Sequence, residues 1–152
     1  MTSKVDSTLS SFPTIKHVLI VDQEDMIRTV LGTLLRSWGF TTCCATSLIA
    51  ACRMVISDGP FDAIICNYDL PDGNAFNLVE WMIRQQVEVP TLVPYGALPP
   101  MAPAPDNVRL VSKPFDPEEL RAAIERAQHC ARPVICRKSA LRRRRGSRRG
   151  GL

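Results

Sequence analysis

Short apolar runs alternate along this chain with stretches that have helical spacing. The runs are rich in β-branched residues, as expected for buried strands. They occupy residues 17–22, 40–46, 63–67, 91–93 and 107–112. The stretches between them carry apolar residues at the i, i+3, i+4 spacing of amphipathic helices. This alternation predicts an α/β fold with a doubly wound, five-stranded parallel sheet covered on both faces.

Local signals place the first three helices. The first apolar stripe consists of Ile27, Val30, Leu31, Leu34 and Leu35. Gly39 follows this stripe and suits a C-terminal cap, whereas Ser47 suits the N-cap of a second helix. The inner face of the second helix is expected to carry Leu48, Cys52 and Val55. The third helix is marked by Phe76, Val79 and Ile83.

The last helix has a strong start signal. Asp116 is placed to cap it, Pro117 takes the first helical position and Glu119 takes the third. The apolar stripe then runs through Leu120, Ile124 and Ala127.

The link between the fourth and fifth strands breaks the alternation. It contains Pro99, Pro100, Pro103 and Pro105, and each would cost about 3 kcal/mol inside a helix. We therefore expect the fourth helix to be lost and replaced by a proline-rich loop.

Polar side chains lie at or just past the ends of four of the expected strands. They are Asp22, Asn67, Tyr95 and Lys113. In doubly wound sheets, ligands bind outside the carboxyl ends of the strands, near the point where the strand order reverses. The four side chains are therefore candidates for a single pocket.

Charge divides the chain into two parts. Residues 132–152 carry nine cations and no acid, whereas the remainder has ten cations against fifteen acids. We expect a disordered N-terminus at residues 1–15, a folded domain at 16–131 and a flexible arginine-rich tail at 132–152. An acidic body with a basic tail suggests two separate roles.

Cysteine usage and hydropathy indicate a cytoplasmic protein. The cysteines are Cys43, Cys44, Cys52, Cys66, Cys130 and Cys136, and no two form a CxxC pair. We expect them to be reduced thiols that act as small core hydrophobes. The N-terminus has no apolar signal region, and no apolar run reaches the roughly 18 residues of a membrane-spanning helix. Membrane insertion is therefore not expected.

Three stretches and their spacing resemble the receiver domain of bacterial response regulators, the CheY-like fold. They are VLIVDQED, FDAIICNYDLPDG and VSKPFDPEEL. The resemblance extends over about residues 15–131. It implies a phosphoryl switch in which two adjacent acids hold Mg²⁺ and an aspartate accepts the phosphoryl group. A small hydroxyl residue and a lysine complete the family's set.

The chain departs from that pattern at most of these positions, so we interpret the pocket as vestigial. Gln23 follows Asp22 where a second acid is expected, and Asn67 takes the acceptor position. Tyr95, or Pro94 after a slip of one residue, stands where the small hydroxyl residue belongs. A neutral carboxamide is a poor nucleophile and does not form a stable acyl phosphate.

The lysine of the family pattern is retained as Lys113. We expect it to hydrogen-bond with Asn67 and to pin the pocket shut. Pro114 follows it, at a position where the peptide bond is cis in much of the family.

Too few carboxylates remain for the usual metal site. Asp22 is kept, with Glu24 and Asp25 as candidate helpers, so we expect no Mg²⁺, no other metal and no cofactor. Asp69 is an alternative phosphoryl acceptor, but we expect its side chain to point to solvent.

The tail is the second informative stretch of the sequence. Its arginines outnumber its lysines eight to one, and a guanidinium group binds phosphate bidentately, reads guanine and stacks on bases. The candidate ligand contacts are Arg137, Ser139, Arg142, Arg143, Arg144, Arg145, Arg148 and Arg149.

The altered pocket, the proline-rich loop and the arginine-rich tail together resemble the Cle group, CheY-like proteins that bind cyclic di-GMP through an arginine-rich C-terminal segment. That resemblance implies a non-enzymatic adaptor that works without phosphorylation. It would bind cyclic di-GMP and then engage a protein partner, such as the flagellar motor switch or another signalling protein.

Three alternatives stay open. An arginine-rich tail also suits nucleic acid, and it suits an acidic surface on another protein or on the body of the same chain. The third alternative is a conventional single-domain response regulator that is switched by phosphorylation at an unusual site.

Overall fold

Five parallel strands form the central sheet of the computed structural model, which describes residues 16–101 and 103–130. The strands are β1 (Lys16–Val21), β2 (Phe40–Ala45), β3 (Ala63–Cys66), β6 (Thr91–Tyr95) and β7 (Val108–Ser112). Their order across the sheet is β2-β1-β3-β6-β7, and all neighbours pair in parallel. The predicted doubly wound sheet is thereby confirmed. The expectations for residues 1–15 and 132–152 fall outside the described residues.

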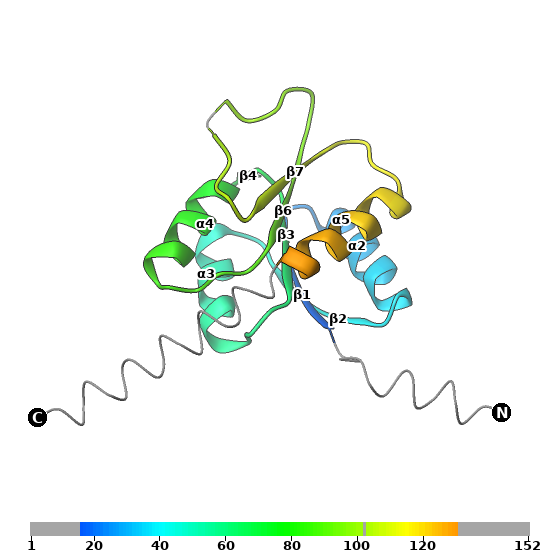
Figure 1. Cartoon of the computed structure of the whole chain (residues 1–152), viewed down its shortest axis with the longest axis horizontal. Coiled ribbons are helices and arrows are strands. Elements are labelled where there is room, and N and C mark those ends of the chain that lie inside the picture. Colours follow the sequence, from blue (N-terminus) through cyan, green and yellow to red (C-terminus); the bar gives the residue numbers. More distant parts are fainter. Residues whose placement is uncertain (1–15, 102, 131–152) are drawn as a thin grey trace, which may run out of the picture.

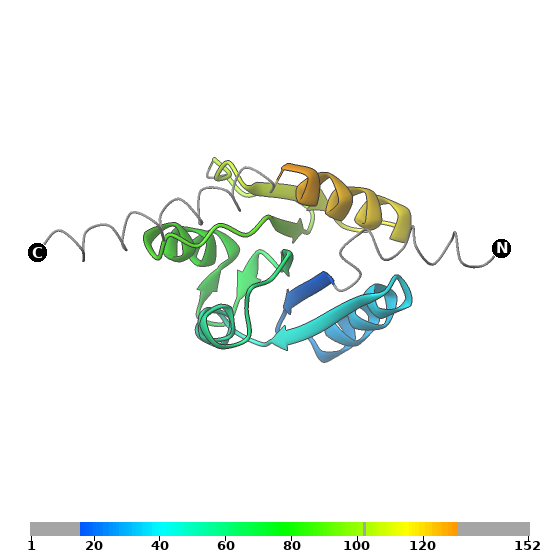
Figure 2. The same ribbon diagram turned by 60° about the horizontal axis from the view of Figure 1, so that its bottom comes forward.

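Helices cover both faces of this sheet. They are α2 (Asp25–Ser37), α3 (Leu48–Ser57), α4 (Ala75–Arg84) and α5 (Pro117–Cys130). Figure 1 shows α3 and α4 on one side of the sheet and α2 and α5 on the other, and Figure 2 shows the same layers from a second direction. None of the helices in the described part of the chain is both long and apolar enough to cross a bilayer.

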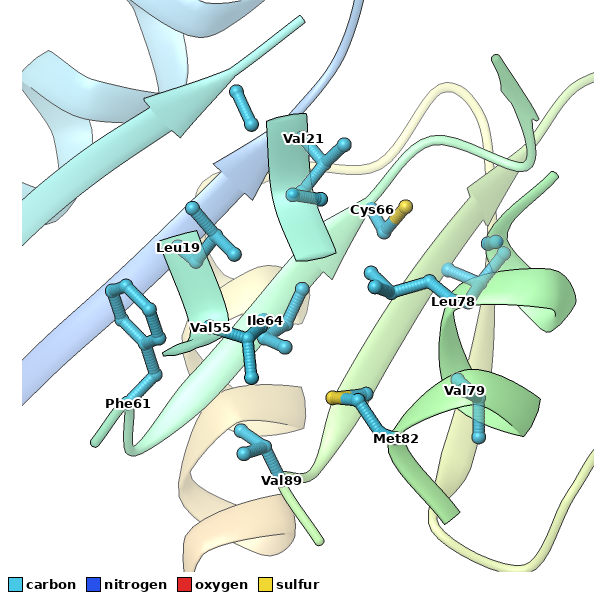
Figure 3. Packing of buried hydrophobic residues seen from close by; sticks show 14 of the residues in the cluster. Leu19, Val21, Val55, Phe61, Ile64, Cys66, Leu78, Val79, Met82 and Val89 are labelled. Atoms are coloured by element: carbon cyan, nitrogen blue, oxygen red, sulfur yellow. The ribbon is translucent and has the colours of Figure 1, made fainter. Parts of the chain in front are cut away.

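The core has two halves, one on each face of the sheet. On the α3–α4 face, Leu19 and Ile64 of the sheet pack with Leu78 of α4, as Figure 3 shows. On the α2–α5 face, Leu35 and Ile124 belong to a second cluster of buried side chains. Each fully buried Leu or Ile contributes about 1.5–3 kcal/mol relative to exposure, so these two halves hold the layers together.

The helix ends match the predicted signals. The Ser47 hydroxyl accepts a hydrogen bond from the Ala50 N–H at 3.1 Å, and the Asp116 carboxylate accepts one from the Glu119 N–H at 2.8 Å. Gly39 follows α2 with a φ of +93°, a conformation that costs glycine least. The three capping predictions are thereby confirmed.

Two residues predicted on buried stripes are exposed. Val30 on α2 and Ile83 on α4 both face solvent, so those two predictions are wrong. The other members of the two stripes behave as expected, since Leu31, Leu35, Phe76 and Val79 are buried. A helix that packs on a sheet buries a narrower stripe than the full i, i+3, i+4 pattern spans.

The proline-rich link between β6 and β7 contains no helix in its described residues, 96–101 and 103–107, as predicted. It forms the loop above the carboxyl end of the sheet in Figure 1. The side chains of Leu98 and Met101 are 83% and 102% exposed. The loop re-enters the sheet through a turn in which the Val108 N–H donates to the Pro105 carbonyl at 3.0 Å.

A short antiparallel hairpin after β3 was not predicted. It consists of β4 (Asp69–Leu70) and β5 (Gly73–Asn74), and its turn places Asp72 over the start of α3. The Asp72 carboxylate accepts hydrogen bonds from the N–H groups of Leu48 at 2.7 Å and Ile49 at 2.9 Å. These donors have no partner within the helix, and the helix dipole also favours a negative charge at this end. Asp72 therefore fastens the hairpin to α3.

Replacing Asp72 by Asn is expected to lower the free energy of unfolding at neutral pH. The N–H groups of Ile49 and Leu48 hold the pKa of Asp72 below its ordinary value of 3.8. The carboxylate therefore stabilises the fold above its unfolded-state pKa, and that contribution is lost as the pH falls through the folded-state pKa. Urea denaturation of both proteins, at neutral pH and at a pH below the folded-state pKa, should show a difference that fades with acid.

Asp69→Asn is the matched control, because Asp69 lies in the same hairpin and is exposed. It should change the free energy of unfolding much less than Asp72→Asn. Equal losses in the two variants, or a loss in Asp72→Asn that does not depend on pH, would contradict the assigned role.

Candidate functional site

The four predicted pocket residues lie at the carboxyl ends of the strands. The β1–β3 register pairs Val21 with Cys66, which places Asp22 and Asn67 side by side just past the two strands. The β6–β7 register pairs Tyr95 with Ser112, and Lys113 is the next residue. The carboxyl ends of the central strands therefore bring these side chains together, on both sides of the point where the strand order reverses.

Asn67 is held at both ends of its side-chain amide. The Lys113 Nζ donates to Asn67 Oδ1 at 2.8 Å, and Asn67 Nδ2 donates to the Asp69 carbonyl at 2.8 Å. A lysine ammonium only donates and a backbone carbonyl only accepts, so this orientation of the amide satisfies both partners. The expected hydrogen bond between Asn67 and Lys113 is present, and it extends one step further into the hairpin.

An amide fits this position better than a carboxylate. An ionised aspartate in the same place would accept from Lys113 but would set its second oxygen against the Asp69 carbonyl, which also only accepts. The local geometry thus matches the residue that the sequence contains.

Asp22 is the buried acid of the pocket, with an exposed fraction of 4%. Its Oδ1 accepts a hydrogen bond from the Glu24 N–H at 2.9 Å. Its backbone carbonyl accepts one from Arg28 Nη1 at 2.7 Å, and Arg28 also pairs with Asp25 at 3.0 Å. These contacts tie the loop between β1 and α2 to the first turn of the helix.

The other acids near the pocket do not build a metal centre. Glu24, Asp25 and Asp69 are all exposed, and so is the neutral Gln23. The exposure of Asp69 agrees with its expected orientation. Among residues 16–101 and 103–130, no group of three or more His, Cys, Asp or Glu side chains is arranged to hold a metal ion.

The remaining predicted residues frame the pocket through their backbone. Tyr95 is the last residue of β6 and is half-buried, whereas Pro94 is buried inside the strand. The Tyr95 carbonyl accepts from the Lys113 N–H at 2.9 Å, and the peptide bond from Lys113 to Pro114 is cis. Of the two residues considered for the position after β6, Tyr95 is therefore the one at the strand end.

Cys66 lies directly before Asn67, and its thiol is buried. Burial, and secondarily the charge of Asp22, raise the pKa of this thiol, so it is protonated and unreactive. Its Sγ donates weakly to the Asn67 carbonyl at 3.5 Å. Cys43 and Cys52 are half-buried, as expected of core thiols, but Cys44 is exposed and the prediction is wrong there. Alternation along β2 turns Cys44 away from the α3–α4 core that Cys43 joins.

Sequence reasoning missed Asp72, which anchors the hairpin beside the pocket. The Asp72–Gly73 pair is a turn signal, and it indicates the turn but not its attachment to α3. The candidate ligand contacts of the tail lie outside the described residues. They are Arg137, Ser139, Arg142, Arg143, Arg144, Arg145, Arg148 and Arg149.

Two curated relatives match this chain over most of its length. Protein Rrf1 of Nitratidesulfovibrio vulgaris, strain Hildenborough, is 31% identical over 115 residues, which are 73% of this chain and 81% of Rrf1. Regulatory protein AtoC of Escherichia coli K12 is 28% identical over 118 residues, which are 74% of this chain. The matched stretch is only 25% of AtoC, so most of that protein has no counterpart here.

A solved structure has the same fold. The N-terminal domain of a response regulator/sensory box/GGDEF protein from Carboxydothermus hydrogenoformans superposes with a TM-score of 0.68. The superposition covers 79% of this chain and 99% of that domain, at 20% identity. The family model of the response regulator receiver domain matches residues 18–125. The chain belongs to the response regulator receiver domain family, whose members are signalling modules.

Proposed function

We propose that this receiver domain is a cytoplasmic, non-enzymatic adaptor that signals without aspartyl phosphorylation. It binds cyclic di-GMP through its arginine-rich C-terminal segment and then engages a protein partner, such as the flagellar motor switch. The observation that supports signalling without phosphorylation is the position of Asn67. Its amide accepts a hydrogen bond from Lys113 and donates one to the Asp69 carbonyl.

The chemistry of the pocket supports signalling that does not depend on aspartyl phosphorylation. A carboxamide is not a competent phosphoryl acceptor. The oxygen and the nitrogen of the Asn67 amide are both already hydrogen-bonded, to Lys113 and to the Asp69 carbonyl. Gln23 supplies no charge beside Asp22, and the neighbouring acids are exposed. A hard cation such as Mg²⁺ wants several carboxylate oxygens, which these residues do not gather.

The charge of the tail supports an anionic ligand. Residues 132–152 have nine cations and no acid, and eight of the nine are arginines. Planar guanidinium forks pair with phosphate and with the O6 and N7 atoms of guanine, and they stack on bases. Cyclic di-GMP offers two phosphates and two guanines, so one short arginine-rich segment serves every part of the ligand.

The described body supports a protein partner. Leu98 and Met101 are exposed on the proline-rich loop, which takes the place of the family's usual crossover helix between β6 and β7. Exposed apolar side chains gathered on one loop are typical of a contact surface.

Incubation of the full chain with acetyl phosphate and Mg²⁺ tests the first part of the proposal. We expect the intact mass to stay unchanged, because Asn67 provides no acceptor. The double variant Asn67→Asp, Gln23→Glu restores two carboxylates and serves as the matched comparison, in which a phosphoryl adduct is expected. A hydroxylamine-labile adduct on the unsubstituted chain would overturn the assignment and favour a phospho-switched regulator.

Titration calorimetry with cyclic di-GMP, GTP and cyclic di-AMP tests the second part. We expect binding of cyclic di-GMP alone, and the paired change Arg144→Ala, Arg148→Ala should weaken it at least about tenfold, since each lost charge-assisted hydrogen bond is worth about 1.5–3 kcal/mol. Arg109→Ala is the control, because Arg109 is an exposed cation of the body and its loss matches the charge change of a single tail substitution.

The same experiment separates the messenger from nucleic acid. Affinity for a polynucleotide should fall with salt by a log–log slope of about −0.9 for each phosphate contacted, whereas a dinucleotide gives a much shallower slope. Equal binding of the three nucleotides would overturn the assignment of cyclic di-GMP as the ligand. If none of them binds and the affinity for DNA falls steeply with salt, nucleic acid is the ligand instead.

A further inference from the structure

An exposed stripe of side chains runs along the outer side of α2. Its members are separated by four, three and four residues, which is the spacing of a seam between two helices. They are Met26, Val30, Thr33 and Ser37, and all of them are exposed. The side chains of Met26 and Val30 are apolar, yet their exposed fractions are 75% and 58%. The opposite side of the helix carries the buried Leu31 and Leu35, so α2 has a second partly apolar side that its own core does not use.

Half-buried apolar side chains connect this stripe to the core. Ile27 and Leu34 lie three and four residues from Val30, so they are its neighbours on the helix surface. Both are half-buried and pack against the cluster of buried side chains on the α2–α5 face. Figures 1 and 2 show α2 at the periphery of the molecule, and no described element covers Met26 or Val30. The apolar surface around Val30 is therefore continuous from the core to solvent.

The order of side chains along the stripe fits a second copy of this chain. The large Met26 lies in the first turn of α2, and the small Ser37 is its last residue. An antiparallel copy places Met26 against Ser37 of the second copy, and Val30 against Thr33 of the second copy. Large side chains then fill the space beside small ones, as interdigitating helices require. Such a match between the two halves of one surface is what an isologous interface needs.

Charges beside the stripe favour the antiparallel orientation. Glu24 is the N-cap residue of α2 and Asp25 lies in its first turn, whereas Arg36 lies in its last turn. Asp25 and Arg36 are about three helical turns apart, so they lie on the same side of the helix. An antiparallel pair brings Arg36 of each copy beside the acids of the other copy, whereas a parallel pair sets like charges together. Asp25 also pairs with Arg28 at 3.0 Å, and Glu24 provides a further exposed acid at this end.

We propose that the stripe of Met26, Val30, Thr33 and Ser37 pairs with the same stripe on a second copy of this chain, as an antiparallel helix pair about a two-fold axis. Each copy contributes one short helix, so the interface is small and the dimer dissociates on dilution. Helix α2 packs on β1 and β2, whereas the proline-rich loop joins β6 to β7 on the other side of the sheet. The dimer therefore leaves the loop of each copy accessible. The inference does not depend on the proposed function.

Sedimentation equilibrium of the full chain tests the pairing, under reducing conditions and between about 1 µM and about 1 mM. We expect a reversible equilibrium between monomer and dimer. Val30→Glu should weaken the dimer at least about tenfold, because it places two carboxylates near each other at the centre of the interface and removes apolar contact. The change should leave the fold intact, since Val30 is exposed and glutamate is the better helix former.

Ile83→Glu is the matched control, because Ile83 is an exposed apolar residue of α4, on the other face of the sheet. It should leave the dissociation constant unchanged. Far-ultraviolet circular dichroism checks that each variant is folded. A parent chain that stays monomeric up to about 1 mM, or a dimer that is equally stable in the parent and in Val30→Glu, would overturn the proposal.

Disulfide cross-linking tests the orientation of the two helices. The background carries Cys44→Ser, Cys130→Ser and Cys136→Ser, so that these thiols take no part. On mild oxidation, a mixture of Met26→Cys chains and Ser37→Cys chains should form a cross-linked dimer, since the two positions meet in the antiparallel pair. Met26→Cys chains alone should not cross-link, because the two copies of that position lie at opposite ends of the interface. No cross-link in the mixture, or a cross-link between Met26→Cys chains alone, would contradict the antiparallel pair.

Discussion

The hydrogen-bond relay from Lys113 through Asn67 to the Asp69 carbonyl is the interaction on which the arrangement at the carboxyl end of the sheet depends. It links the end of β7 to the end of β3 and to the hairpin, and the hairpin is fastened to α3 by Asp72. Only a side chain that both accepts and donates completes the relay, which is what a carboxamide provides and a carboxylate does not. The carboxamide at the end of β3 is thus the side chain that connects Lys113 to the hairpin.

The apolar core that stabilises the fold lies away from this relay. The two core clusters are built from apolar side chains on both faces of the sheet, and Asp22 is the only pocket carboxylate among the described residues that is buried. Substitutions at the carboxyl ends of the strands therefore leave the helices packed on both faces of the sheet. The same independence explains how the crossover after β6 exists as a proline-rich loop while Leu92 and Val93 of that strand stay fully buried.

The sequence was sufficient for features that depend on local patterns. Strand runs, the caps at Ser47 and Asp116 and the proline-rich loop all follow from neighbouring residues, and all are present. Features that depend on contacts between distant segments were out of reach. Helical spacing does not show how wide the buried stripe of a helix is, so Val30 and Ile83 were predicted to be buried although they are exposed. The contact between His17 Nε2 and Cys43 Sγ, at 3.6 Å, depends on the register between β1 and β2, and no local pattern encodes that register.

The length of the sheet separates the pocket from the C-terminal end of α5. Helix α5 begins four residues after Lys113 and runs back along the sheet, so its C-terminal end lies away from the pocket. A strand of β7's length spans about 17 Å at 3.3–3.4 Å per residue, which exceeds the Debye length of about 8 Å at physiological ionic strength. A charge at the C-terminal end of α5 is therefore largely screened from the exposed Lys113. Within the described domain, coupling between the C-terminal end of α5 and Lys113 therefore runs through the packing of α5 on the sheet rather than through the electric field.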